Sequence, residues 1–317
     1  NFRFHINLST YQLISLSSFS LFAFSRCLPA RSANGILKGM SGGIRKRILR
    51  RILREEEPLD LKDPLVTERI FRLELGSSYR KYWDNLARTK QLAYFAVAGL
   101  PFGENPDDKN LLEHGRQTSL IIIKKLEIKP EDDVLEVGVG VGRLVSHIAK
   151  SCKSFTGIDI SRQMIKFAKK RLKDYPNVRL IHHPKSDLSL FPDESFDKII
   201  FQIVLIHLDR EDAFHYLRES FRLLSPGGMA WFQFYNLLHP DGFKEFKYAV
   251  DLSQKLGGKL RGRVQLYTPD EVRKLVMEAG FRIREDKSYL EKQEQKFEFE
   301  PPDAHWFYYL IAVAEKP

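Results

Sequence analysis

An acidic residue and three alternating glycines follow a short apolar run, and a helical pattern begins directly after them. These residues are Glu136, Gly138, Gly140 and Gly142. Glycine adopts left-handed dihedrals and lets backbone approach a ligand closely, and a helix start offers unpaired N–H groups. Asp159 ends the next apolar run, 17 residues after Gly142, and its carboxylate can accept hydrogen bonds from two vicinal hydroxyls at once. This spacing predicts a strand–turn–helix corner that holds a nucleotide-like ligand.

The glycine spacing argues against two common nucleotide sites. A dinucleotide-binding turn reads G-x-G-x-x-G, whereas here the third glycine comes one residue early and Arg143 occupies the expected position. A phosphate-cradling loop needs a Lys-Ser/Thr pair after its glycines, and the sequence has none there. At this point a glycine-rich turn without any ligand stays open beside the ligand-binding reading.

Four segments, taken in order, resemble the motifs of the class I S-adenosylmethionine (SAM) methyltransferases. The first is the Glu-x-Gly-x-Gly-x-Gly run, and the second is Gly157-Ile158-Asp159-Ile160-Ser161 with Met164. The others are Lys185-Ser186-Asp187-Leu188 and Arg222-x-Leu224-x-Pro226-Gly227-Gly228. The last of these predicts a tight turn into a fifth strand over 230–235. The resemblance covers about residues 115–317 and implies SAM as the cofactor.

The resemblance also implies roles for individual residues. Asp159 would hold the ribose, Ile160 would pack on the adenine, and Asp187 would accept a hydrogen bond from the adenine amino group, with the Leu188 N–H serving a ring nitrogen. The implied cofactor-binding set is Glu136, Gly138, Gly140, Gly142, Asp159, Ile160, Met164, Asp187, Leu188 and Gln202. No metal site is expected. His182 and His183 are adjacent on a strand and therefore point to opposite faces, so both are read as structural.

One histidine follows the fourth strand, which is expected over 196–204 and whose end should face the methyl group of the donor. His207 could act there as a general base, and it is the candidate catalytic residue. The alternative is a positioning or structural role, because this family carries histidine at the same place in enzymes of differing chemistry. Gln202 and Leu205 lie at the same strand end.

Apolar runs and helical patterns alternate around these motifs, which predicts an α/β fold. The resemblance implies a Rossmann-like seven-stranded sheet in the order 3-2-1-4-5-7-6, with the last strand antiparallel. Helices are expected at 66–75, 78–97 and 111–126, and they resemble an N-terminal helical cap. Aromatics such as Tyr79 and Trp83 are then either packing residues or part of a lid over the substrate. Thr268, Pro269 and Glu271 predict a capped helix start.

The chain divides by composition into three parts. Residues 1–39 contain no acidic residue and are read as a non-core leader or upstream sequence, with a secretory signal or a transit peptide as alternatives. Residues 40–114 form the helical segment, and residues 115–317 form the SAM-dependent domain with an insertion near 237–265. Residues 1–60 hold ten Lys/Arg and four Asp/Glu, so they carry +6 of the net charge of +10. Residues 44–54 predict a basic amphipathic helix, which either packs on the domain or contacts a membrane, RNA or a partner.

These features predict a SAM-dependent methyltransferase that acts on an O, N or C centre of a small molecule. One alternative is an RNA or protein methyltransferase that uses residues 44–54 as an arm, and another is a SAM-binding scaffold without catalysis. Nucleic acid is not the favoured partner. The apolar run at 13–24 is too short and too polar to span a bilayer. The two cysteines, Cys27 and Cys152, give no disulfide framework, so a cytoplasmic location is the default.

Overall fold

The computed structural model describes residues 78–98, 108–259, 262–290 and 309–317. The leader at 1–39, the basic segment at 44–54 and the predicted helix at 66–75 lie outside these residues. No helix within the described ranges combines the length and apolarity that a bilayer crossing needs.

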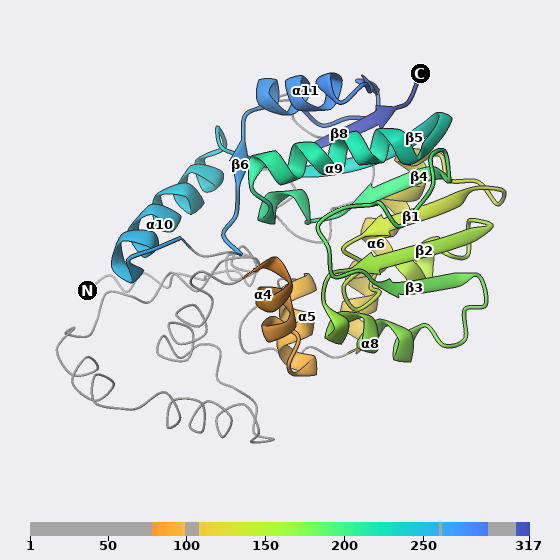
Figure 1. Ribbon diagram of the computed structural model, residues 1–317, viewed down its shortest axis with the longest axis horizontal. Coiled ribbons are helices and arrows are strands. Elements are labelled where there is room, and N and C mark those ends of the chain that lie inside the picture. The colour runs from red at the N-terminus through yellow and green to blue at the C-terminus, as the bar shows by residue number, and fades with distance from the viewer. Residues whose placement is uncertain (1–77, 99–107, 260–261, 291–308) are drawn as a thin grey trace, which may run out of the picture.

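A mostly parallel sheet forms the centre of the molecule (Figure 1). Its order is β3-β2-β1-β4-β5-β8-β7, and β8 runs antiparallel to both of its neighbours. This confirms the predicted order. The sheet has one strand more than predicted, because the two-residue β6 pairs in parallel with the end of β5. The strands are β1 Asp133–Val137, β2 Ser154–Asp159, β3 Val178–His182, β4 Phe196–Phe201, β5 Leu224–Asn236, β6 Leu266–Tyr267, β7 Arg282–Ile283 and β8 Tyr309–Glu315.

Helices cover both faces of the sheet. α6, α7 and α8 pack on one face and α9 and α11 on the other, while α4 and α5 form the cap and α10 follows β5. The helices are α4 Tyr79–Leu86, α5 Lys90–Ala98, α6 Asp108–Leu126, α7 Val145–Ile148, α8 Arg162–Arg171, α9 Arg210–Leu223, α10 Pro240–Leu256 and α11 Pro269–Glu278, with a 3-10 turn, η3, at Leu205–His207.

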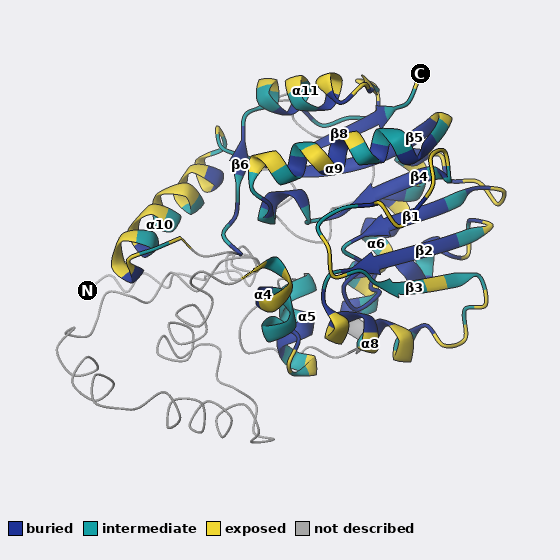
Figure 2. Ribbon diagram, in the orientation of Figure 1, coloured by how far each residue is buried: buried dark blue, intermediate teal, exposed yellow. Residues whose placement is uncertain are grey.

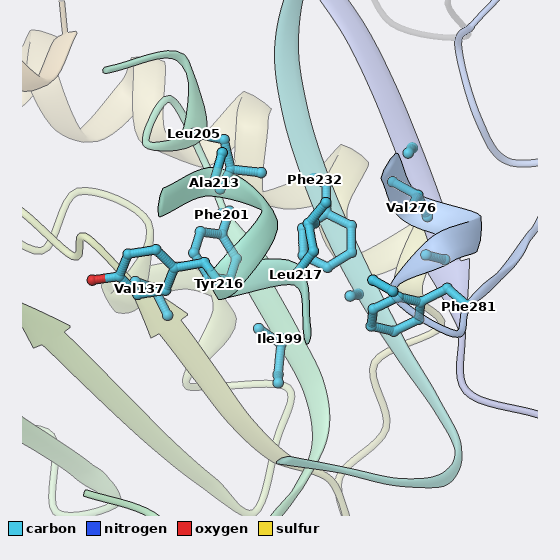
Figure 3. Close-up of a cluster of buried hydrophobic side chains, with 14 of the residues drawn as sticks. Val137, Ile199, Phe201, Leu205, Ala213, Tyr216, Leu217, Phe232, Val276 and Phe281 are labelled. Atoms are coloured by element: carbon cyan, nitrogen blue, oxygen red, sulfur yellow. The ribbon is translucent and has the colours of Figure 1, made fainter. Parts of the chain in front are cut away.

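The core has two layers because side chains alternate along each strand. On β5, Met229 and Trp231 belong to the layer under α6–α8, whereas Ala230, Phe232 and Phe234 belong to the opposite layer. Figure 3 shows this opposite layer, in which aromatic rings and aliphatic side chains of the sheet meet α9 and α11. The central strands β1, β2, β4, β5 and β8 are therefore buried on both faces, as a parallel sheet requires, whereas the edge strand β3 is only half-buried.

Local signals set most helix starts. The Ser161 hydroxyl caps α8 by accepting from the Met164 N–H, and the Thr268 hydroxyl caps α11 by accepting from the Glu271 N–H. The predicted capping box is only half formed, because the Glu271 carboxylate pairs with Arg210 instead. The predicted helix over 78–97 is two helices, since the Thr89 hydroxyl accepts from the Leu92 N–H and starts α5 anew.

Two strand boundaries differ from the sequence expectation. The fourth strand ends at Phe201 rather than Val204, because Ile203 adopts a positive φ of 58°. The fifth strand begins at Leu224, and the expected tight turn at Pro226-Gly227-Gly228 is taken up as an irregular stretch of that strand with Gly227 at φ 76°.

Candidate functional site

A pocket opens at the carboxyl ends of the parallel strands, beneath the cap. It encloses about 1000 Å³ of empty space when its open mouth is included, a size suited to a cofactor or a drug-sized ligand. Strand ends and the glycine turn form its sheet side, while α4, α5 and η3 form its cap side. Its lining includes Tyr79, Trp83, Ala96, Val97, Glu136, Gly138, Gly140, Arg143, Asp159, Ile160, Met164, His183, Lys185, Ser186, Gln202, Ile203, Val204, His207, Leu208 and Tyr216.

The three motif glycines all adopt left-handed backbone, with φ of 76°, 54° and 77° at Gly138, Gly140 and Gly142. Added Cβ atoms would also collide with protein. At Gly138 a Cβ would lie 2.4 Å from Val204 Cγ2, and at Gly140 it would lie 2.6 Å from Val97 Cγ1. The glycines are therefore needed for the turn and for close packing of the cap and the β4 end. Gly142 packs against Leu172 and does not line the pocket.

Asp159 is buried at the end of β2 and fixes the glycine turn. One carboxylate oxygen accepts from the Gly140 N–H and the other from the Ser161 N–H, each at 2.8 Å. Burial raises the pKa of Asp159 to about 6, although these two hydrogen bonds act in the opposite direction. Each oxygen keeps a second lone pair, so the carboxylate can still accept from a ligand hydroxyl.

Glu136 is 3% exposed, and its Oε2 has no hydrogen-bond partner among the described residues. Burial raises the pKa of Glu136 to about 8, while the nearby charge of Arg143 lowers it. The Arg143 guanidinium is itself buried and contacts His114 Nδ1 at 3.3 Å. A buried acceptor without a partner is costly unless a ligand satisfies it.

The segment after β3 departs from the expectation. Asp187 and Leu188 do not line the pocket, whereas His183, Lys185 and Ser186 do. Asp187 Oδ1 accepts from the Ser189 hydroxyl at 2.8 Å and lies 3.0 Å from His183 Nε2. Leu188 is fully buried in the core. Asp187 therefore does not reach the pocket itself, but it contacts His183, which lines the pocket.

Two residues just after β4 have special features: the Gln202 carboxamide is fixed by a hydrogen bond, and Ile203 has a positive φ. Gln202 Oε1 accepts from the buried Trp231 indole N–H at 2.9 Å, which leaves the amide N–H₂ group as its donor. The next residue, Ile203, is β-branched with a positive φ, a conformation that costs about 1–3 kcal/mol. It turns the chain so that Val204 covers Gly138.

His207 lines the cap side of the pocket and lies next to Trp83, with ring centroids 5.0 Å apart. Its Nδ1 is 3.2 Å from the Gly262 carbonyl oxygen, so Nδ1 carries the proton and Nε2 keeps a lone pair. Burial lowers the pKa of His207 to about 4, although the Gly262 hydrogen bond raises it. The imidazole is therefore neutral at physiological pH.

Eight of the eleven residues predicted for the site line this one pocket: Glu136, Gly138, Gly140, Asp159, Ile160, Met164, Gln202 and His207. Tyr79 and Trp83 of α4 also line it. Sequence reasoning missed Arg143, although its place directly after Gly142 was a signal, and it read His183 as structural. Within the described ranges, no group of three His, Cys, Asp or Glu side chains gathers as metal ligands.

Residues 134–228 match the family model described as "Methyltransferase domain". The demethylmenaquinone methyltransferase of Tropheryma whipplei (strain Twist) is 36% identical over 107 residues, which are 33% of this chain and 42% of that protein. The ribosomal RNA small subunit methyltransferase A of Leuconostoc mesenteroides is 35% identical over 117 residues, 35% of this chain and 37% of that protein. The chain thus spans less than half the length of these curated relatives.

Solved structures resemble this chain only distantly. A SAM-dependent methyltransferase from Methanosarcina mazei has a TM-score of 0.49 and 21% identity, over 62% of this chain and 96% of that one. The family match covers the strand–glycine–helix corner, Asp159 and the Pro226-Gly227-Gly228 segment. Residues 134–228 of the chain therefore carry a methyltransferase domain.

Proposed function

We propose that this protein binds SAM in the pocket and transfers its methyl group to a small-molecule acceptor. The observation that carries the proposal is a pair of buried carboxylates, Glu136 and Asp159, on one pocket wall beside a left-handed glycine turn. Glu136 Oε2 is an acceptor that lacks a partner among the described residues. SAM fits this wall because it offers an ammonium group, a sulfonium charge and a ribose diol.

Each residue of the sheet-side wall has a distinct task in this proposal. Asp159 accepts from the ribose hydroxyls while its hydrogen bonds to Gly140 and Ser161 hold the turn. Glu136 accepts from the ammonium group, and Arg143 serves the ligand's carboxylate. Ile160 and Met164 provide apolar surface for the adenine, whose amino edge faces His183 with Asp187 behind it.

Bound SAM would supply a methyl group on a positively charged sulfur. A lone pair of the acceptor would attack the methyl carbon in line, and the sulfur would leave with the bonding electrons as the neutral thioether S-adenosylhomocysteine. The protein's contribution is orientation and exclusion of water. The Gln202 amide, held by Trp231, donates to the acceptor. His207 Nε2 takes a hydrogen bond or a proton from the substrate that receives the methyl group, because Nδ1 is already engaged with the Gly262 carbonyl oxygen. With a pKa of about 4, the imidazole passes such a proton on to water readily.

A small acceptor follows from the cap-side wall. Trp83, Tyr79, Val204 and Leu208 make this side apolar and aromatic, and α4 lies over it. The names of the two relatives above include both a demethylmenaquinone and a ribosomal RNA methyltransferase, so the acceptor is proposed from the pocket alone.

Two measurements test the proposal in sequence. Calorimetry with SAM and with its demethylated product S-adenosylhomocysteine measures binding, and the absence of heat with both would refute the cofactor assignment. Labelled SAM is then incubated with fractionated metabolites, RNA and proteins. Label in a low-molecular-weight fraction supports the small acceptor, whereas label only in RNA or protein overturns that part.

A further inference from the structure

The outer side of the cap and the neighbouring helix α8 form a strongly basic face. On α8, the exposed Arg162, Lys166, Lys169 and Lys170 recur at helical spacing, and α8 contains no acidic residue. Lys173 continues the same line just beyond the helix. Figure 2 shows exposed positions along this outer side of α8. Because residues three and four apart share one helix face, these side chains form one stripe, which we name the α8 stripe.

A groove runs beside the α8 stripe, between α8 and α4. Its lining comprises Ser78, Arg80, Lys81, Asp84, Asn85, Arg88, Arg162, Gln163 and His182. Its one acid, Asp84, already accepts from the Ser161 hydroxyl at 2.8 Å. Arg80, Lys81 and Arg162 form no ion pair with another described residue, and the same is true of Lys166, Lys169 and Lys170. Cations thus stand on both walls of the groove and continue along α8.

Helix α4 separates this groove from the pocket. Tyr79 and Trp83 face the pocket, whereas Arg80, Lys81 and Asp84 line the groove. The two sites therefore share a wall without sharing these residues. None of the groove's basic side chains belongs to the proposed cofactor or acceptor site, so cofactor chemistry does not account for the charge.

We infer that the groove and the α8 stripe bind the phosphate backbone of a single-stranded nucleic acid. A row of unpaired cations is the electrostatic footprint of phosphodiester binding, since each contact releases counterions from the strand. Two basic walls suit a chain that lies between them. A planar lipid surface would favour large apolar side chains beside the cations, and the exposed positions of the stripe carry none.

The test uses the full chain and a short fluorescein-labelled oligouridylate as the probe, followed by fluorescence anisotropy. Binding should weaken steeply between about 50 and 200 mM salt. The variant Lys166→Glu/Lys169→Glu/Lys170→Glu should bind about tenfold more weakly or worse, and the slope of log K against log salt should fall by about 2. A second variant, Arg80→Ala/Arg162→Ala, removes one cation from each wall of the groove, leaves the three lysines of the stripe in place, and should also weaken binding.

A matched control places the same charge change on another exposed helix. Lys244→Glu/Lys247→Glu/Lys255→Glu alters α10 and should change the affinity by less than about twofold. SAM affinity is measured on every variant and should stay unchanged. An unchanged affinity shows that the variant is folded, and it separates the result for nucleic acid from the proposed methyltransferase function. If the triple lysine variant does not fold, the loss of oligouridylate binding in Arg80→Ala/Arg162→Ala tests the inference instead.

Four results would overturn the inference. They are no binding of oligouridylate by the wild-type protein at low salt, equal losses in the α8 and α10 variants, full displacement of the probe by inorganic phosphate, and preferential binding of phosphatidylserine vesicles through the same lysines. The third result would mean a site for a single phosphate, and the fourth would mean a lipid surface.

Discussion

The two sides of the pocket are built on different principles. The sheet-side wall consists of buried polar groups on consecutive strand ends, and its hydrogen bonds join residues close in sequence or on paired strands, as Asp159 does with Gly140 and Ser161. The cap-side wall consists of Trp83, Val97 and His207, which come from three separate elements. His207 contacts Gly262 on yet another segment. The first wall is a local motif, whereas the second exists only when distant elements pack.

The two walls also differ in charge. Two carboxylates with raised pKa values occupy the sheet side, and a histidine with a lowered pKa occupies the cap side. Burial favours the neutral form in every case. With pKa values of about 6 and about 8, Asp159 is nevertheless mostly ionised near neutral pH, whereas Glu136 is mostly neutral. A cationic ligand would favour the ionised form of the carboxylates, which couples its binding to pH on the sheet side only.

The largest effect is expected where the two walls meet, at Gly138. Gly138→Ala should lower the free energy of unfolding by about 2–4 kcal/mol, because φ is 76° and the new methyl group meets Val204. Chemical denaturation measures this loss. Gly227→Ala is the matched control, since Gly227 has the same φ but no neighbour within 4 Å of an added Cβ. Adding Val204→Ala to Gly138→Ala should restore part of the loss, and an equal cost at both glycines would contradict the packing explanation.

Asp159→Ala should weaken SAM binding about 100-fold, because two charge-assisted hydrogen bonds of about 1.5 kcal/mol each are lost. Calorimetry measures the change. Asp159→Asn keeps the shape and one acceptor and should lose less. An unchanged affinity in the alanine variant would remove Asp159 from the ribose site. Thermal melting without ligand reports the separate contribution of the Gly140 and Ser161 hydrogen bonds.

Glu136→Gln should weaken SAM binding about tenfold at pH 9 and less at pH 6, because wild-type Glu136 has a pKa of about 8 and gains its charge only as pH rises. The same shift has a stability consequence. A carboxyl whose pKa is raised on folding contributes stability below its unfolded pKa of about 4.5, and that stability is lost as pH rises through about 8. Melting curves of the glutamine variant should therefore vary less between these values. Identical pH profiles for both proteins would exclude ionisation of Glu136 from binding.

The smallest effect is expected on the cap side. His207→Gln should lower turnover several-fold to about tenfold, below the range typical of a strong general base, and should leave SAM affinity unchanged. At saturating SAM, where ionisation of Glu136 no longer limits binding, the wild-type turnover should be independent of pH above about 6, because the His207 pKa is about 4. Rate measurements with the acceptor found in the labelling screen provide the test. A turnover equal to wild type would return His207 to a structural role.

The comparison also separates what was readable in the sequence from what was not. Strands at Ser154–Asp159 and Val178–His182 follow from apolar runs, and the Ser161 and Thr268 caps follow from local hydroxyls. Local patterns also gave the glycine turn, because left-handed dihedrals are a property of single residues. The predicted end of β4 at Val204 was wrong, because Ile203 has a positive φ and a β-branched residue gives no sequence signal for that conformation.

The sequence by itself determined most strands and helices and the chemistry of the motif wall, because these depend on short-range patterning and on residues at fixed spacing. The order of the sheet was implied only by the family resemblance. Only the tertiary structure decided which side chains complete the pocket. It brought His183 to the wall in front of Asp187, set Trp231 on Gln202, and brought Gly262 to His207. It also joined α4 and α8 into one basic groove. Apart from the His183–Asp187 pair, these contacts link residues tens of positions apart. They depend on packing between elements, which no local pattern encodes.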